Sequence, residues 1–440
     1  MFDHRTICYV LGLAAALINA GTAAAQARSL AITRVNLIDV VNGRIIPNST
    51  VTIRGSTIAS VTSNGSRPQN ARIVDGQGKF LIPGLWDMHA HMEAAGEAWL
   101  QLYVANGVTS IRDMGSDLDL ILNMRDATAS GRVLGPHIFA AGPILDDPPG
   151  DWPFRMRVKT AEDGRVAVQL LKRRGVDLIK VHDHTPREAF FAIAEEARQQ
   201  NLPLAGHVPN GLKVEEIVDA GQRDIEHLDN LRLWKPCPGE GYNGPEACRQ
   251  LFEMLARRGV WQTPTLVAMS ELATIGTSAS KVSAEHLAYA NKALRGMWAG
   301  NQSLFATRPV VVKQLRDGAE IGGRVTSDMA KAGVGILAGC DSMIAGFCVH
   351  EELAAMVRGG MTPLAALQTA TLNPLRYFGL EQTLGMAAGK RADLVLLDAN
   401  PLTDITNVGR IRAVVVAGRL LDRKELDSLL SQVKTAAKQP

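Results

Sequence analysis

The stretch Leu81-Ile82-Pro83-Gly84-Leu85-Trp86-Asp87-Met88-His89-Ala90-His91 decides how the rest of the chain is interpreted. It is typical of a buried strand that ends in a His-x-His pair. Side chains alternate between the two faces of a strand, so His89 and His91 point the same way. Two imidazoles on one face can bind a single metal ion. The alternative is two strand-end histidines satisfied by hydrogen bonds alone, and residues further along the chain must separate these interpretations.

Strand-like and helix-like segments alternate after this stretch. Thr185-Pro186-Arg187-Glu188 is typical of a capping box that opens a helix, which we expect to run through Gln200. The alternation predicts an α/β fold, specifically a (β/α)8 TIM barrel. An open doubly wound sheet is disfavoured, because no Gly-x-Gly-x-x-Gly follows the first strand. The eight predicted barrel strands are 85–91, 109–114, 137–142, 176–181, 203–208, 224–228, 261–266 and 335–340.

Polar side chains stand at the predicted C-terminal ends of several of these strands, where a barrel places its active site. After the His-x-His pair come Lys180, His207, His227 and Asp341. Each has an ordinary alternative, because a strand-end histidine is often a core residue and an aspartate there often caps a helix. Their joint placement on strands one, four, five, six and eight favours a shared metal site.

The two ends of the mature chain are rich in β-branched residues and turns, unlike the middle. We expect both ends to build one small β-sandwich domain, because chain termini usually lie close together. The predicted boundaries are 28–82 and 380–425 for the β-sandwich, 83–379 for the barrel, and 426–440 for a C-terminal helix or tail.

The first residues have the pattern of a secretory signal. A short basic start, an apolar run and the small residues 21–27 predict a signal peptide over residues 1–25, cleaved after Ala25 or Ala27. An uncleaved membrane anchor is the alternative, although the apolar run is short for a span. Cleavage implies export to the periplasm or the medium, an oxidising setting in which Cys237 and Cys248 can form a disulfide. We expect Cys340 to be a small buried residue.

The composition narrows the range of partners. The chain has 440 residues, of which 46% are hydrophobic and 21% charged, and its formal net charge is +3. The charges are mixed, and aromatic residues make up only 5%, so neither a basic nucleic-acid surface nor a base-stacking platform is expected. We expect a small-molecule substrate, no membrane span after signal cleavage, and leave open whether the protein is a homo-oligomer.

The sequence resembles the amidohydrolase superfamily, and within it exported members of the dipeptidase and imidazolonepropionase-like subgroup. The similarity covers roughly residues 29–425 and is specific for the superfamily rather than for a substrate. Its matching stretches are 83–91, 107–115, 177–181, 205–209, 225–228, 337–342 and 385–398.

The resemblance implies a TIM barrel with a site for two divalent metal ions, most simply Zn2+. His89, His91 and Asp341 would hold one ion, and His207 and His227 the other. Lys180 would bridge both as a carbamate, since carbamylation turns its amine into an anion that two cations stabilise. A single-metal site with an unmodified Lys180 is the alternative.

The implied activity is hydrolysis of an amide C–N bond, as in a dipeptide or an N-acyl amino acid, by a metal-activated hydroxide. Asp341 would serve as catalytic residue and move the proton from water to the leaving amine. One alternative is a hydrolase of a cyclic amide, lactone or phosphotriester on the same metal site. Another is a non-enzymatic binding protein that retained the fold.

Five further side chains near the predicted strand ends remain to be placed. His182 shares a face with Lys180 and is a candidate for substrate binding. We expect Arg112 and Asp113 to form a buried structural pair under the site. Arg155 and Arg157 could bind a substrate carboxylate, but we expect each of them to be solvated surface.

Overall fold

The protein is described from a computed structural model. It describes residues 29–63, 67–92, 96–149, 154–228, 242–274, 284–342 and 344–438. The predicted signal peptide, residues 1–25, and Cys237 lie outside these ranges, so both remain predictions. Within the same ranges, no helix combines the length and apolar character that crossing a membrane requires.

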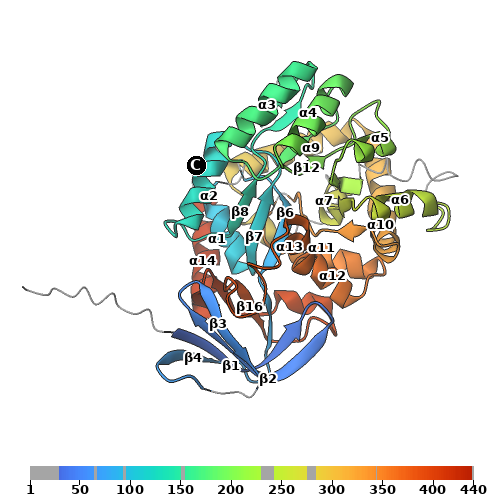
Figure 1. Ribbon diagram of the computed structural model, residues 1–440. Coiled ribbons are helices and arrows are strands. Elements are labelled where there is room, and N and C mark those ends of the chain that lie inside the picture. Colours follow the sequence, from blue (N-terminus) through green and yellow to red (C-terminus); the bar gives the residue numbers. More distant parts are fainter. Residues whose placement is uncertain are drawn as a thin grey trace, which may run out of the picture.

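Parallel strands form a barrel at the centre of the molecule (Figure 1). Backbone hydrogen bonds join its two sheets: Asp177 N donates to Ala140 O at 2.8 Å, and Met88 N donates to Ala338 O at 2.8 Å. The predicted TIM barrel is therefore confirmed. Its strands are β6 (Leu85–Ala90), β7 (Val108–Asp113), β8 (His137–Ala140), β11 (Ile179–Val181), β12 (Leu204–Gly206), β13 (Asp224–Glu226), β14 (Trp261–Thr263) and β15 (Gly335–Ile336).

Two short strands were not predicted. β9 (Ile144–Asp146) pairs in parallel with β11, and β10 (Arg155–Arg157) pairs in parallel with β9. Each has only three residues, which is too few for an alternating pattern to stand out in a sequence. They extend the sheet beyond β11, the fourth barrel strand.

Helices surround the barrel and separate successive strands. Thr160 and Asp163 form a capping box at the start of α3, and Gly175 ends the same helix with a φ of 83°. The helices are α1 (Ala98–Ala105), α2 (Leu118–Ala129), α3 (Ala161–Arg174), α4 (Arg187–Gln199), α5 (Val214–Asp219), α6 (Arg249–Arg257), α7 (Leu266–Ala273), α8 (Ala284–Leu287), α9 (Lys292–Ala306), α10 (Pro309–Lys331), α11 (Phe347–Arg358), α12 (Pro363–Thr369), α13 (Leu372–Phe378) and α14 (Arg423–Ala436).

The start of α4 differs from its prediction. The helix follows Pro186 as expected, but Thr185 does not cap it. The Thr185 hydroxyl instead donates to the carbonyls of Leu145 and His182, at 3.0 and 2.9 Å. Tertiary contacts to β9 and to the loop after β11 therefore replace the local capping box.

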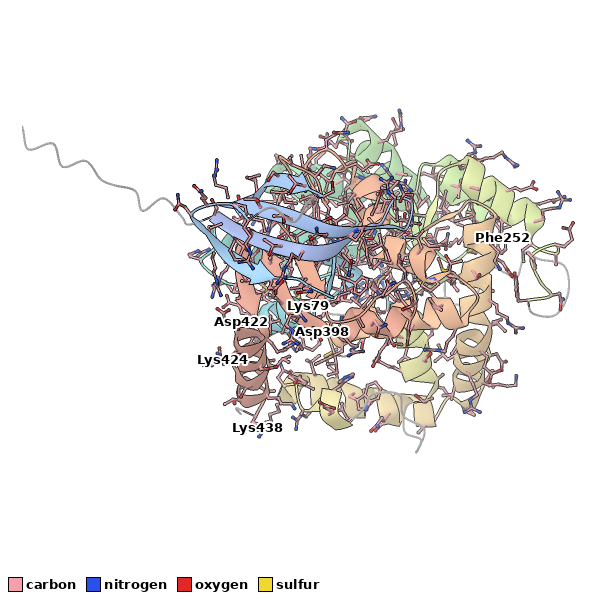
Figure 2. All side chains as sticks on the ribbon, turned by 90° about the horizontal axis from the view of Figure 1, so that it is seen from below. Lys79, Phe252, Asp398, Asp422, Lys424 and Lys438 are labelled. Carbon is pink, nitrogen blue, oxygen red and sulfur yellow. A yellow bond between two sulfur atoms is a disulfide. The ribbon has the colours of Figure 1, made fainter. Side chains whose placement is uncertain are left out.

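Strands from both ends of the chain pair in one sheet below the barrel (Figure 1). β5 from the first part and β16 from the last pair antiparallel, and Lys79 bonds Asp398 at 3.0 Å beside this junction (Figure 2). The domain boundaries themselves remain a prediction. The strands are β1 (Ser29–Asp39), β2 (Arg44–Arg54), β3 (Thr57–Thr62), β4 (Ala71–Asp75), β5 (Phe80–Pro83), β16 (Leu394–Leu397), β17 (Ile411–Val416) and β18 (Arg419–Asp422).

Candidate metal centre

The two histidines of the opening stretch present their Nε2 atoms to a common point. His91 Nδ1 lies 2.9 Å from the Gly115 carbonyl, which only accepts, so Nδ1 carries the proton. His89 Nδ1 lies 2.6 Å from Glu226 Oε2 and donates in the same way. Burial lowers the pKa of His89 well below its ordinary value, so this ring is neutral. His89 Nε2 therefore offers a lone pair, and it lies 3.3 Å from His91 Nε2.

Asp341 completes a triangle of donors with these two rings. Its Oδ1 lies 3.5 Å from His91 Nε2 and 3.9 Å from His89 Nε2. Burial raises the pKa of Asp341, while nearby His91 and Lys180 oppose that rise. The residue has a φ of 49°, a left-handed conformation that aspartate tolerates better than most residues.

The spacing of this triangle fits a metal ion. Two nitrogens bound tetrahedrally to zinc at about 2.0–2.1 Å stand about 3.3 Å apart. The measured separation of the His89 and His91 Nε2 atoms is 3.3 Å. This separation therefore supports a metal ion bound between the two nitrogens.

His227 lies next to the donor triangle, and His207 lies next to His227. Their rings are 4.9 Å apart, and the His227 ring is 4.5 Å from the His89 ring. His227 Nδ1 lies 2.7 Å from Thr265 Oγ1 and 3.8 Å from Asp341 Oδ2. His207 Nδ1 lies 3.1 Å from Asp183 Oδ1. Burial lowers the pKa of His227, which keeps that imidazole neutral and able to bind a metal.

Lys180 is buried among these groups, with 1% of its surface exposed. Burial lowers the pKa of its amine, while Glu226 and Asp341 pull in the opposite direction. A lowered pKa increases the neutral fraction of the amine, and only a neutral amine can react with carbon dioxide. The structure thus brings all six sequence-predicted ligand candidates into one cluster, and their role as ligands remains a proposal.

Asp87 joins two of the strand ends that carry these candidates. Its Oδ1 accepts the backbone N–H of His89 at 3.0 Å and of Cys340 at 2.9 Å. Tyr103 Oη donates to the other carboxylate oxygen at 3.4 Å. Burial raises the pKa of Asp87 to about 7. This role of Asp87 was not predicted, although a carboxylate inside an apolar strand is a signal for a structural contact.

Arg112 supports the site from below. Its guanidinium donates to Asp224 Oδ2 at 2.6 Å and to Glu226 Oε1 at 2.9 Å, and Nε donates to the Met88 carbonyl at 2.6 Å. Glu226 then accepts from His89 through its other oxygen. Arg112 therefore orients His89 through one shared carboxylate.

The prediction that Arg112 and Asp113 form a pair is wrong. Both side chains are buried, but Asp113 accepts from Met92 N at 2.9 Å and from Ser116 Oγ at 2.8 Å. Consecutive residues on a strand point to opposite faces, so the two cannot meet. The partners of Arg112 were not predicted either. Asp224 and Glu226 alternate with apolar residues on one strand, so their side chains share a face.

Cys340 is buried as predicted, but it is not a simple packed thiol. It forms a disulfide with Cys348 at the start of α11, with Cα atoms 5.8 Å apart. The bond closes the loop that begins with Asp341. Only the return of the chain into α11 brings the two sulfurs together, which local sequence patterns do not show.

His182 stacks on His207, with ring centroids 3.9 Å apart. Its Nδ1 lies 3.7 Å from Asp146 Oδ2, and 21% of the side chain is exposed. Burial lowers the pKa of His182. The His182 ring therefore lies beside His207, a ligand candidate, and its contact with substrate remains a prediction.

A cavity of about 260 Å³ opens onto the donor triangle. The prediction that Arg155 is solvated surface is wrong, because β10 brings its side chain into the wall with 12% exposed. Arg157 is exposed as predicted, at 42%. The described residues lining the cavity are His89, Ala90, His91, Trp99, Tyr103, Ile144, Phe154, Arg155, His182, Leu294, Met297, Cys340, Asp341, Ser342 and Ala345.

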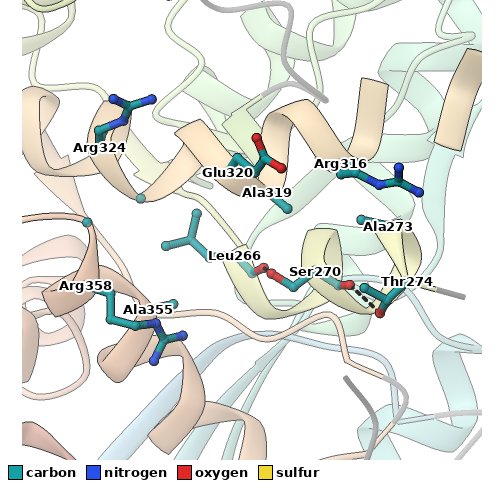
Figure 3. Close-up of a pocket in the computed structure, with 12 residues that line it drawn as sticks. Leu266, Ser270, Ala273, Thr274, Arg316, Ala319, Glu320, Arg324, Ala355 and Arg358 are labelled. Atoms are coloured by element: carbon teal, nitrogen blue, oxygen red, sulfur yellow. Dashed lines mark hydrogen bonds between the residues drawn. The ribbon is translucent and has the colours of Figure 1, made fainter. Parts of the chain in front are cut away.

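A second hollow, of about 530 Å³, lies outside the barrel between α7, α10 and α11 (Figure 3). Arg316, Arg324 and Arg358 surround it together with Glu320. None of the six ligand candidates lines this hollow, so it is separate from the metal-type site.

The fold places these candidate donors at the strand ends of a parallel α/β barrel. The family model described as "Amidohydrolase family" matches residues 80–421, so the chain belongs to the amidohydrolase family. The predicted superfamily is thereby confirmed. The protein is a hydrolase that acts on carbon–nitrogen bonds, which removes the alternative of a non-enzymatic binding protein.

Curated relatives and solved structures agree with this assignment. Ochratoxinase from Aspergillus niger is 25% identical over 435 residues, covering 83% of this chain and 80% of the relative. The solved bottromycin amidohydrolase has a TM-score of 0.76 at 25% identity, covering 93% of this chain and 91% of its own. A putative prolidase from Bifidobacterium longum has the same fold, with a TM-score of 0.73 at 23% identity, covering 92% and 99% of the two chains.

Proposed function

We propose that the protein hydrolyses the amide bond of a dipeptide or an N-acyl amino acid with the help of two divalent metal ions, zinc being the first choice. The observation that carries this is the triangle of donor atoms from His89, His91 and Asp341 at the wall of a cavity. The proposed ligands are His89, His91, Lys180, His207, His227 and Asp341.

The metal ions, when bound, would polarise the scissile carbonyl and make a water nucleophilic near neutral pH. Lys180 would share its charge between them as a carbamate, for which its burial and lowered pKa provide the neutral amine. His207 and His227 are oriented for this by Asp183 and Thr265, which bond their Nδ1 atoms.

Asp341 would carry the proton. It takes the proton from the attacking water and gives it to the amine that leaves, so one carboxylate serves both steps. Its position supports this role, because Asp341 lines the cavity and its Oδ1 faces the His91 Nε2 at 3.5 Å. The buried surroundings raise the pKa of Asp341, which makes it a better proton acceptor than an exposed aspartate.

We also propose that the protein is exported to the periplasm or the medium. The signal-like pattern of residues 1–25 supports this. The Cys340–Cys348 disulfide is a second support, because disulfides persist in oxidising compartments.

A substrate panel tests the proposed activity. Purified mature protein, first stripped with a chelator and then loaded with zinc, is assayed on dipeptides, N-acyl amino acids, cyclic amides, lactones and phosphotriesters. We expect amide hydrolysis that requires the metal and is absent from the stripped sample. Hydrolysis confined to lactones, cyclic amides or phosphotriesters would contradict the proposed substrate class.

Replacing Lys180 tests the carbamate bridge. We expect Lys180→Ala to lower the metal content from about two ions per chain to one or fewer, since the shared anionic ligand is lost. Metal analysis of the purified variant measures this directly. Lys172→Ala on the exposed face of α3 is the matched control and should keep the full content. Unchanged occupancy in Lys180→Ala would refute the bridge.

A further inference from the structure

We propose that Arg155 binds the free carboxylate of the substrate, and that the apolar wall beside it receives a large apolar side chain on the same amino-acid residue. This rests on the proposed function and specifies its substrate class. The substrate would be an N-acyl amino acid, or a dipeptide, whose C-terminal residue is aromatic or a large aliphatic one.

The position of Arg155 is set by tertiary pairing. Arg155 lies opposite Ile144 in the β9–β10 pair, and its Nε donates to Asp146 Oδ2 at 3.1 Å. The Asp146 side chain is fully buried and also accepts the His184 N–H at 2.9 Å. A charge-assisted bond to a fixed carboxylate orients the guanidinium. A guanidinium has five N–H donors in a planar fork, a geometry that matches a carboxylate.

Arg155 is also close to the proposed chemistry. Asp146 Oδ2 lies 3.7 Å from His182 Nδ1, and the His182 ring stacks 3.9 Å from the ring of His207. A short chain of contacts thus leads from the guanidinium to a proposed metal ligand. In an N-acyl amino acid the carboxylate carbon lies one residue repeat, about 3.3–3.6 Å, beyond the scissile carbonyl. The cavity joins Arg155 and Asp341 in one wall, as such a substrate requires.

The charge of the cavity favours an anionic ligand. Among the described residues that line it, Arg155 is the only lysine or arginine and Asp341 is the only carboxylate. Asp341 would bind the proposed metal ions. Arg155 is then the charged side chain of the cavity wall that can recognise a substrate carboxylate. An arginine fork matches a carboxylate in two parallel hydrogen bonds.

The remaining wall favours an apolar group. Trp99, Ile144, Phe154, Leu294 and Met297 line the cavity, and Met297 is 46% exposed although it is a large apolar side chain. Small-molecule sites are typically apolar with a few placed polar groups. The cavity volume of about 260 Å³ is below the roughly 300–1,000 Å³ of drug-sized sites, which suits a compound of the size of an acylated amino acid.

A pair of substrates isolates the carboxylate. N-acetyl-L-phenylalanine and N-acetylphenethylamine carry the same amide and the same ring, but only the first has a carboxylate. For zinc-loaded wild-type protein we expect kcat/KM to favour the acid by about 10²-fold, the scale of a desolvated charge pair. Arg155→Met should reduce this preference to within about threefold, and Arg155→Lys should give an intermediate value, because lysine keeps the charge but not the fork.

The ratio of the two substrates protects the test against a folding defect. A partly unfolded variant loses activity on both compounds equally, so only a recognition role changes the ratio. Arg157→Met, two residues along the same strand and bonded to Asp147 at 2.8 Å, is the matched control and should keep the wild-type ratio. Calorimetric binding of L-phenylalanine, a reaction product, supplies a readout without turnover and should weaken in Arg155→Met.

The outcomes separate this inference from the proposed function. If wild-type protein cleaves both amides and Arg155→Met leaves their ratio and the binding of L-phenylalanine unchanged, the role of Arg155 is refuted while the amide activity stands. If wild-type protein cleaves no amide of either kind, the proposed function fails, and this inference with it. A collapsed ratio with metal content unchanged supports the inference.

Discussion

Asp341→Asn is expected to lower kcat roughly 10³-fold while the protein stays folded. The amide has nearly the shape of the carboxylate, so the left-handed backbone at this position and the neighbouring disulfide are retained. An amide cannot accept the proton of the attacking water, and loss of a positioned acid–base group costs about 10²–10⁴-fold. Steady-state kinetics on the best substrate of the panel, normalised to bound metal, measures the change.

Two controls define what this result means. Thermal unfolding should be close to wild type, and Asp317→Asn, an exposed residue of α10 bonded to Lys313 at 2.7 Å, should keep full activity. Metal content is measured because Asp341 is also a proposed ligand. A kcat near the wild-type value at equal metal loading would refute the proton-transfer role of Asp341.

Arg112→Met should destabilise the protein by about 3–5 kcal/mol, the usual cost of removing one partner from a buried charge network. Arg112 is fully buried and bonds both Asp224 and Glu226, which would be left with uncompensated charge. It also lies over the Tyr377 ring at 5.3 Å, a contact that methionine only partly replaces. Urea unfolding followed by circular dichroism gives the free energy of unfolding.

The loss of folding stability in Arg112→Met should increase as the pH rises. Burial already raises the pKa of Asp224, and removing the cation takes away a charge that opposes this rise. A carboxyl whose folded pKa lies above its unfolded value contributes stability at low pH and loses it as the pH rises through the folded pKa. The deficit against wild type should therefore be larger at pH 8 than at pH 5.

A surface arginine provides the comparison for this second prediction. Arg165→Met on α3 breaks an exposed pair with Glu162 and should change the free energy of unfolding by less than about 1 kcal/mol at either pH. An Arg112→Met variant as stable as Arg165→Met would show that the buried network does not support the fold.

The barrel could be predicted because its signal is local and repeated. Each strand is a short apolar run and each helix an amphipathic one, and their alternation admits few topologies. The strands β9 and β10 were not predicted, because three residues are too few to show an alternating pattern. The predicted capping box at Thr185 does not form, because the Thr185 hydroxyl bonds carbonyls on β9 and in the loop after β11.

The candidate site likewise has a part that the sequence predicts and a part that it does not. Strand ends and side-chain parity placed six candidates on one rim, since both follow from the geometry of a single strand and of a closed barrel. The partners that orient them could not be predicted. Glu226 reaches His89 from another strand, 137 positions further along the chain. Asp87 accepts from the backbone of Cys340 across 253 positions, and only its bond to the His89 backbone is local.

The sequence by itself determined the fold class and the strand ends that carry the candidate site residues, because period-2 strands and their ends are local properties. It determined the family through the motif stretches that resemble the amidohydrolase superfamily. Only the tertiary structure decided which histidine nitrogens face one another, that Cys340 binds Cys348, and that Arg155 enters the cavity. These depend on distances between segments far apart in the chain. Such distances are set by packing of the whole barrel, which no local pattern encodes.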